Sequence, residues 1–133
     1  MGAYFSLLAY KDEKLEKCLF LSPVVDMKFL IDNMMKWSNV TEEELRERQE
    51  IKTDWGQMLY WDYYEYVKQN PIERWDNKTF ILYGANDDLQ PRELMQKFAD
   101  KFGCELTVLE NGEHYFHTEE QVKKYEEWLD LKK

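Results

Sequence analysis

The sequence lacks three features that would direct it to particular classes of partner. It has no apolar run near the ~18 residues that a membrane-spanning helix needs, so no membrane partner is expected. Residues 1–9 contain no basic side chain, which argues against a secretion signal. Basic residues number 18 against 27 acidic ones. The net charge of −9 would repel a phosphate backbone, so nucleic acid is not an expected partner either.

Cysteine is also scarce, with only Cys18 and Cys104 in the chain. Two cysteines build neither a disulfide framework nor a multi-cysteine zinc site, and a reducing, cytoplasmic setting fits best. Each cysteine begins a segment with strand character. One intervening strand would separate them by about 9.6 Å, which is too far for a disulfide, so both are expected to be small core residues.

The chain length and the pattern of apolar residues predict one α/β domain over residues 1–133. Short continuous apolar runs are typical of strands buried on both faces of a parallel sheet, and helical patterns lie between and around them. About three parallel strands flanked by helices are therefore expected. The expected strands are 17–22, 79–84 and 105–110, and the expected helices are 2–10, 91–102 and one that starts at Thr118 with Val122, Tyr125, Trp128 and Leu129 facing a core.

Residues 27–76 form an excursion too long for a simple crossover between strands. A capping box at Thr41 predicts a charged helix, and residues 55–66 are rich in aromatic side chains. One interpretation is a helical cap inserted over a substrate pocket. The pocket would be lined by Trp55, Tyr60, Trp61 and Tyr64. The other is a helix that packs its aromatic face onto the sheet or onto a partner.

Two loops follow the second and third expected strands and carry the candidate chemistry. Asp87 follows one strand and His114 follows the next, each at the carboxyl end. Adjacent parallel strands lie about 4.8 Å apart, so the two side chains can come within hydrogen-bond range. An aspartate that orients a histidine supplies two members of a nucleophilic triad. Asp26, which follows the first strand, is an alternative acid.

Structural and metal-binding interpretations of the same residues stay open at this point. An aspartate after a strand is commonly a turn residue, and a histidine beside a glycine turn is commonly structural. His114 and His117 could form a metal pair with Glu113 or Glu119, but two loop histidines three residues apart are a weak signal. No metal and no cofactor is expected.

The loop Gly84–Pro91, the loop 112–116 and their spacing resemble the α/β-hydrolase family of serine esterases and lipases. The resemblance covers the whole chain, but only as the C-terminal part of that fold. It implies Asp87 as the triad acid, His114 as the general base, and an ester or related acyl compound as the substrate.

The resemblance also indicates what the sequence does not contain. The family's nucleophile lies in a G-x-S-x-G turn between a strand and a helix. Met1 and Gly2, followed by a helix, resemble the residues after that serine, which implies that the Met1 N–H contributes to the oxyanion hole. The serines of this sequence lack glycines at the flanking positions: Ser6, Ser22 and Ser38. The chain alone is therefore predicted to be inactive as an enzyme.

Two functional hypotheses remain. The first is an acyl hydrolase whose serine is supplied by a complementing N-terminal segment. The alternative is a catalytically inactive remnant or interaction module that binds a partner through its aromatic cap. In either case the first strand would be a long apolar edge. It is expected to be covered by a second copy in a dimer, by the complementing segment, or by the cap.

Overall fold

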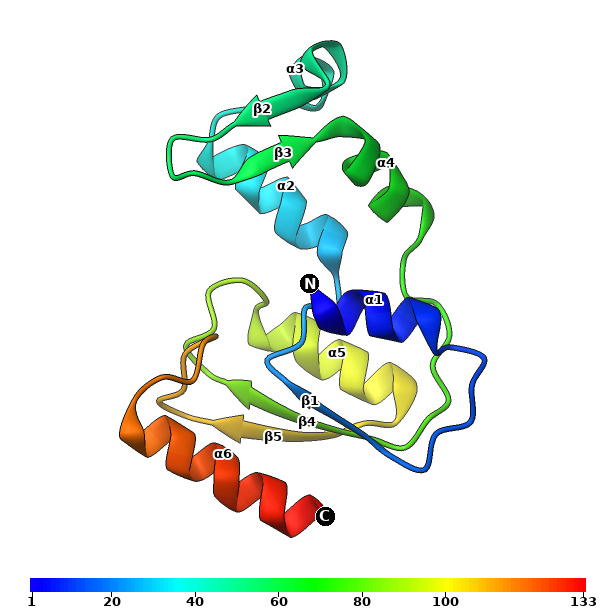
Figure 1. The fold of residues 1–133 in the computed structure, drawn as a ribbon, viewed down its shortest axis with the longest axis vertical. Helices are drawn as coiled ribbons and strands as arrows, with labels where there is room; N and C mark the ends of the chain where they lie inside the picture. Colours follow the sequence, from blue (N-terminus) through cyan, green and yellow to red (C-terminus); the bar gives the residue numbers. More distant parts are fainter. The chain divides into compact units, whose positions relative to one another are not determined.

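The computed structural model describes all 133 residues, and the chain divides into two compact units (Figure 1). The first unit combines Met1–Val25 with Ile72–Lys133, and the second unit is Asp26–Pro71. The second unit ends before residue 76, the expected end of the insertion, because Ile72 and Trp75 pack in the core of the first unit.

The first unit is built on a three-stranded parallel sheet in the order β1-β4-β5. The strands are β1 (Cys18–Leu21), β4 (Thr79–Gly84) and β5 (Glu105–Leu109). This confirms the α/β class and the parallel pairing predicted from the apolar runs. Because β4 is central, the loops after β4 and β5 leave neighbouring strands at the same end of the sheet.

Helices cover both faces of this sheet (Figure 1). They are α1 (Gly2–Ala9), α5 (Arg92–Phe102) and α6 (Glu119–Lys132). Gly103, at φ 63°, ends α5 in the left-handed conformation that glycine adopts without strain. The Thr118 hydroxyl accepts a hydrogen bond from the Gln121 N–H at 3.2 Å and thereby caps α6, as the sequence predicted.

The alternation of β4 side chains divides the core of this unit into two clusters. Ile81 and Tyr83 face a cluster that includes Leu7 of α1 and Met95 of α5. Leu82 points the other way and packs with Phe116 and Trp128. The prediction that Val122 faces the core is wrong, because its side chain is 37% exposed. The neighbouring Gln121 is buried instead, since its amide bonds to the histidine loop.

The second unit contains three helices and a hairpin. They are α2 (Met27–Trp37), α3 (Glu42–Arg48), β2 (Glu50–Lys52), β3 (Met58–Tyr60) and α4 (Trp61–Gln69). The antiparallel β2-β3 pair was not predicted, because the capping box at Thr41 and the aromatic run 55–66 indicated a helical cap. None of the helices in the structure combines the length and the apolar surface needed to cross a bilayer.

Candidate functional site

The loops that leave β4 and β5 bring Asp87 and His114 together. His114 Nδ1 lies 2.7 Å from Asp87 Oδ2. The Asp87 side chain is completely buried, whereas 30% of the His114 side chain is exposed. The carboxylate is therefore shielded from solvent while the imidazole remains accessible. This is the arrangement needed to orient a histidine whose other nitrogen is to exchange a proton.

Each oxygen of the Asp87 carboxylate has a separate role. Oδ1 accepts hydrogen bonds from the Leu89 N–H at 2.8 Å and from the Gln90 N–H at 3.1 Å, which closes the turn before α5. Oδ2 is then left to contact His114. One oxygen of Asp87 therefore closes the turn, and the other contacts the histidine.

Two glycines allow the acid loop and the histidine loop to approach this closely. A Cβ on Gly84 would lie 2.4 Å from the Gly112 carbonyl oxygen, and one on Gly112 would lie 2.9 Å from Gly84 Cα. The loops are also joined by backbone hydrogen bonds, from Ala85 N–H to the Leu109 carbonyl and from Asn86 N–H to the Gly112 carbonyl, at 2.9 and 2.8 Å. The backbones therefore touch where any larger side chain would separate them.

The histidine loop is held on its other side by Gln121, which the sequence analysis did not identify. Gln121 Nε2 donates to the Asn111 carbonyl at 3.4 Å and to Glu113 Oε2 at 3.1 Å. Gln121 Oε1 accepts from the His117 N–H at 3.3 Å. One buried amide on α6 thus bonds to both ends of the loop that carries His114. The capping position at Thr118 could have indicated where α6 starts, but not that its third residue would turn inward.

Tyr83 on β4 forms a hydrogen bond with the acid loop that follows this strand. Its hydroxyl donates to the Gln90 carbonyl at 2.7 Å, and the side chain is fully buried. Burial, together with the nearby negative charge of Asp87, raises the pKa of Tyr83 above its ordinary value. The phenol therefore stays protonated and remains a hydrogen-bond donor at neutral pH.

The metal-binding interpretation requires a cluster that the structure does not form. No group of three or more histidine, cysteine or acidic side chains in residues 1–133 is placed to hold an ion. His114 is engaged with Asp87. The Nδ1 atom of His117 lies 2.8 Å from the Tyr115 carbonyl oxygen and 3.4 Å from Glu113 Oε2.

Asp26, the alternative acid, caps a helix in the second unit. Its carboxylate accepts a hydrogen bond from the Phe29 N–H at 3.0 Å at the start of α2, and the residue is exposed. This is the ordinary N-cap role of an aspartate. Of the two candidate acids, Asp87 is the one that contacts a histidine.

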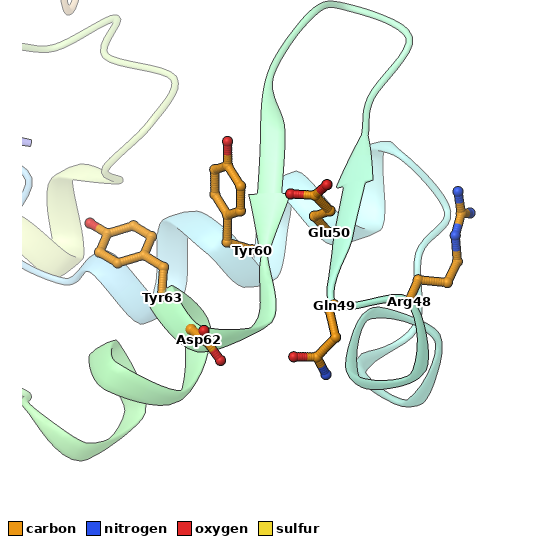
Figure 2. Close-up of a pocket in the computed structure, with 6 residues that line it drawn as sticks. All are labelled: Arg48, Gln49, Glu50, Tyr60, Asp62 and Tyr63. Carbon is orange, nitrogen blue, oxygen red and sulfur yellow. The ribbon is translucent and has the colours of Figure 1, made fainter.

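The four aromatic residues expected to line a substrate pocket have different surroundings. Tyr60 lines a cavity of about 500 Å³ with Tyr63, Asp62, Glu50 and neighbouring side chains. Figure 2 shows the Tyr60 and Tyr63 rings on one side of this cavity, while the Arg48 side chain points away from them. Trp61 lines a separate cavity of about 360 Å³.

Trp55 and Tyr64 complete the set. Trp55 lines a small cavity of about 70 Å³ and packs edge-on against Trp37, with ring centroids 6.4 Å apart. Tyr64 is buried, and its hydroxyl donates to Asp32 Oδ1 at 2.6 Å. Burial and the Asp32 carboxylate raise the pKa of Tyr64. The three exposed or half-exposed rings thus line three different cavities, and the fourth ring belongs to the packing of this unit.

The three serines lie in separate parts of the structure, and Met1 lies next to the helix that holds one of them. Ser6 lies within α1, and Ser38 ends α2. Ser22 follows β1 with φ 45°, and its hydroxyl is buried without a hydrogen-bond partner. No hydrogen bond joins a serine to His114. Met1 immediately precedes α1 and is 71% exposed.

Comparison with known proteins gives matches among solved structures only. No family model and no curated protein matches the chain. Est1E from Butyrivibrio proteoclasticus, in a structure with ferulic acid bound, is 18% identical, with a TM-score of 0.69 over 98% of this chain and 54% of that one. A protein of Agrobacterium vitis S4 described as a hydrolase is 16% identical, with a TM-score of 0.77 over 98% and 57% of the two chains. Mouse alpha/beta hydrolase domain-containing protein 10 is 12% identical, with a TM-score of 0.69 over 98% and 59%.

The chain therefore spans a little over half the length of these structures. At such low identity the likeness concerns the fold and not the activity. The parallel sheet in the order β1-β4-β5, its flanking helices and the matches to hydrolase structures lead to one assignment. The chain has part of the α/β-hydrolase fold.

Proposed function

We propose that Asp87 and His114 are the acid and the general base of a serine-hydrolase site that acts on esters or related acyl compounds. The observation that carries this proposal is the 2.7 Å contact between His114 Nδ1 and a fully buried Asp87 carboxylate. The neighbouring structures, which include Est1E with ferulic acid bound and a protein described as a hydrolase, support the same reaction class.

In the proposed mechanism each nitrogen of His114 has its own task. With Nδ1–H held by Asp87, Nε2 is the nitrogen that accepts the proton of a serine hydroxyl as its oxygen attacks the carbonyl carbon of the substrate. The Asp87 carboxylate stabilises the resulting imidazolium. His114 then returns this proton to the leaving alcohol, and the acyl group stays on the serine. Water, activated by the same nitrogen, releases the acid and restores the serine.

The serine itself is proposed to come from a segment outside these residues. None of Ser6, Ser22 and Ser38 lies in a G-x-S-x-G sequence. In the proposed site the backbone nitrogen of Met1 supplies one oxyanion donor. This agrees with its position just before α1, where backbone N–H groups are unpaired and the helix dipole favours negative charge.

The substrate is proposed to carry an apolar acyl or aryl group, because the second unit exposes aromatic rings. Trp55, Tyr60 and Trp61 each line a different cavity of that unit. Tyr64 would hold the Trp61 ring in place rather than contact the substrate, because it is buried and its ring centroid lies 6.0 Å from that of Trp61. Ferulic acid, which is bound to Est1E, is an aromatic acid of the kind that hydrolysis of such an ester would release.

The test uses a fluorophosphonate probe, which labels activated serines. The tagged 133-residue chain is expressed in its source cells, recovered with whatever binds it, and treated with the probe. Label is expected on a polypeptide that contains the chain or is bound to it. Labelling should be lost in His114→Ala and kept in His117→Ala, because His117 is the matched loop histidine without an aspartate partner.

The purified chain by itself should not turn over p-nitrophenyl esters above the buffer rate. Labelling that persists in His114→Ala would refute the assigned base. Turnover by the purified chain that is abolished in His114→Ala but survives alanine at all three serines would refute the serine mechanism. That result would require another nucleophile or an activated water.

A second candidate is an inactive interaction module, which the exposed tryptophans favour. Trp37 and Trp55 are 54% and 50% exposed and lie in edge contact, an apolar surface typical of a binding site. Absence of any fluorophosphonate label, together with loss of a bound partner in Trp55→Ala, would support this candidate over the hydrolase.

We also propose that the free edge of β1 is paired in the working protein, by a second copy or by the segment that supplies the serine. β1 is an edge strand, and Leu21 on it is 39% exposed. Light scattering on the purified chain should then give at least a dimer, or a monomer that binds the complementing segment.

The thiols of Cys18 and Cys104 are free, which fits the reducing, cytoplasmic compartment proposed from their number.

A further inference from the structure

Gln90 is the only glutamine in the first unit with no exposed surface, and its relative exposure is 0%. Buried amides are uncommon and need partners for both ends. Gln90 Oε1 accepts the Val25 N–H at 3.1 Å, and Gln90 Nε2 donates to the Leu89 carbonyl at 3.0 Å. The side chain thus joins the segment after β1 to the loop after β4.

The backbone of Gln90 is fixed as firmly as its side chain. Its carbonyl accepts the buried Tyr83 hydroxyl at 2.7 Å, and its N–H donates to Asp87 Oδ1 at 3.1 Å. The second of these bonds reaches the candidate site directly. The other oxygen of the same carboxylate contacts His114.

We propose that Gln90 is a positioning residue whose buried side chain aims its own N–H at Asp87 and thereby holds the Asp87 carboxylate against His114. The proposal rests on the role assigned to the Asp87–His114 pair above. Val25 lies outside any strand, so its N–H has no sheet partner, and Gln90 Oε1 satisfies it. In return the Val25 N–H fixes the Gln90 side chain.

This bridge completes the support of the acid loop. From the β5 side the loop is held by the Gly84–Gly112 contact and by the backbone bonds of Ala85 and Asn86. From the β1 side Gln90 supplies the corresponding anchor. Without the Gln90 anchor, the Gln90 N–H would no longer be fixed against Asp87 Oδ1, and the Leu89 N–H would be left to hold that oxygen. The carboxylate would then sample more orientations, and its Oδ2 contact with His114 would weaken.

The test replaces Gln90 with methionine, which has the same chain length but no amide. The readout is the NMR signal of His114. When Asp87 accepts a hydrogen bond from His114, the neutral imidazole carries its proton on Nδ1, and this Nδ1–H gives a resonance protected from exchange. In Gln90→Met this resonance is expected to disappear and the nitrogen shifts to indicate a mixture of tautomers. The amide of Val25 should exchange about tenfold faster, as expected for one lost hydrogen bond.

The matched control is Phe98→Leu, a core change on α5 that destabilises the unit without altering a polar contact of the acid loop. It should keep the His114 Nδ1–H resonance. An Nδ1–H signal that survives in Gln90→Met would overturn the proposal. Equal loss of this signal in Gln90→Met and Phe98→Leu would also overturn it, because the loss would then reflect lower stability in general.

Hydrogen exchange on the unsubstituted chain covers the case in which Gln90→Met fails to fold. Val25 should then be protected to the same degree as the central β4 amides, and exchange at the rate of an open loop would refute the bridge. None of these readouts needs a nucleophile or a substrate. A missing Nδ1–H signal in the unsubstituted chain would instead count against the Asp87–His114 pair and the proposed function.

Discussion

Replacing Gly84 with alanine is the sharpest test of how the two loops fit together. The added Cβ would lie 2.4 Å from the Gly112 carbonyl oxygen, 2.5 Å from the Gly112 carbonyl carbon and 2.6 Å from the Glu113 carbonyl oxygen. All three atoms belong to backbone and none to a flexible side chain. A change of rotamer therefore cannot relieve the overlap, and the histidine loop has to move away from β4.

The size of the effect follows from that geometry. Overpacking in a core ordinarily costs about 1–3 kcal/mol, and a clash with three backbone atoms belongs at the upper end of that range. For a chain of this length, a loss of about 3 kcal/mol corresponds to a fall of roughly 6–12 °C or more in the melting temperature. Moving the loop also separates His114 from Asp87, so the Nδ1–H resonance of His114 should be lost in any folded fraction.

Thermal and urea denaturation measure the loss, and Gly2→Ala is the matched control. No atom lies within 4 Å of a Cβ built on Gly2, which is the first residue of α1. The same substitution there should leave stability unchanged or raise it by up to about 1 kcal/mol, because alanine is the better helix residue. Gly112→Ala should be intermediate, since its nearest contact would be 2.9 Å.

A melting temperature for Gly84→Ala equal to that of the unsubstituted chain, with the His114 resonance in place, would refute this reasoning. It would mean that the two loops are not in backbone contact. The order of the three alanine variants is a further check, because it depends on the distances and not on the absolute scale of the energies.

Three further changes test separate parts of the structure. Asp87→Asn keeps the Oδ1 acceptor of the turn but offers an amide to His114, so unfolding free energy should fall by only about 1 kcal/mol, while ester hydrolysis by the complemented enzyme should fall by roughly 10⁴-fold. Thr118→Ala removes the cap of α6 and should cost about 1 kcal/mol in urea denaturation. Burial raises the pKa of Cys104 from 9.0 to about 11, so the folded chain keeps a thiol proton that the unfolded chain loses. The contribution of Cys104 to the free energy of unfolding should therefore be fully present below pH 9 and be lost as the pH rises towards 11. Cys104→Ala should make the decrease in stability over this pH range smaller.

The parts of the fold that were predicted correctly are those with local signals. Gly103 ends α5 because the left-handed conformation at its position suits glycine, and this can be recognised without knowing the rest of the structure. The continuous apolar run at 79–84 indicated a strand buried on both faces, and β4 is the central strand. Strand adjacency indicated that Asp87 and His114 could come within hydrogen-bond range, and their side chains lie 2.7 Å apart.

The β2-β3 hairpin was not predicted because its strands are too short to show an alternating pattern in the sequence. Each strand has only three residues, of which one is buried, so no alternation is long enough to detect. Gly56, at φ 91°, lies in the connecting turn and was the one available indication. The aromatic run 55–66 hid the boundary at Trp61, where β3 ends and α4 begins.

The supporting glutamines could not be predicted for a different reason. Glutamine is ordinarily a surface residue, so neither Gln90 nor Gln121 stands out in a sequence. Their partners are backbone groups in other loops, and the Val25 N–H lies 65 residues from Gln90 in the chain. Such contacts depend on where the sheet brings distant loops together, and a pattern of residue types does not encode that.

The contacts that hold Asp87 and His114 in place all lie within the first unit. Asp87 is held by the turn of its own loop and His114 by the glycine contact and by Gln121. In the proposed site, Asp87 and His114 would therefore be oriented before the proposed serine is supplied. A segment that supplies the serine would need only to place its hydroxyl within hydrogen-bond distance of His114 Nε2, without having to build the rest of the site. Complementation should consequently restore the rate of the chemical step as soon as the segment binds, and a slow rearrangement of His114 after binding, seen as a lag in product formation, would contradict a preformed pair.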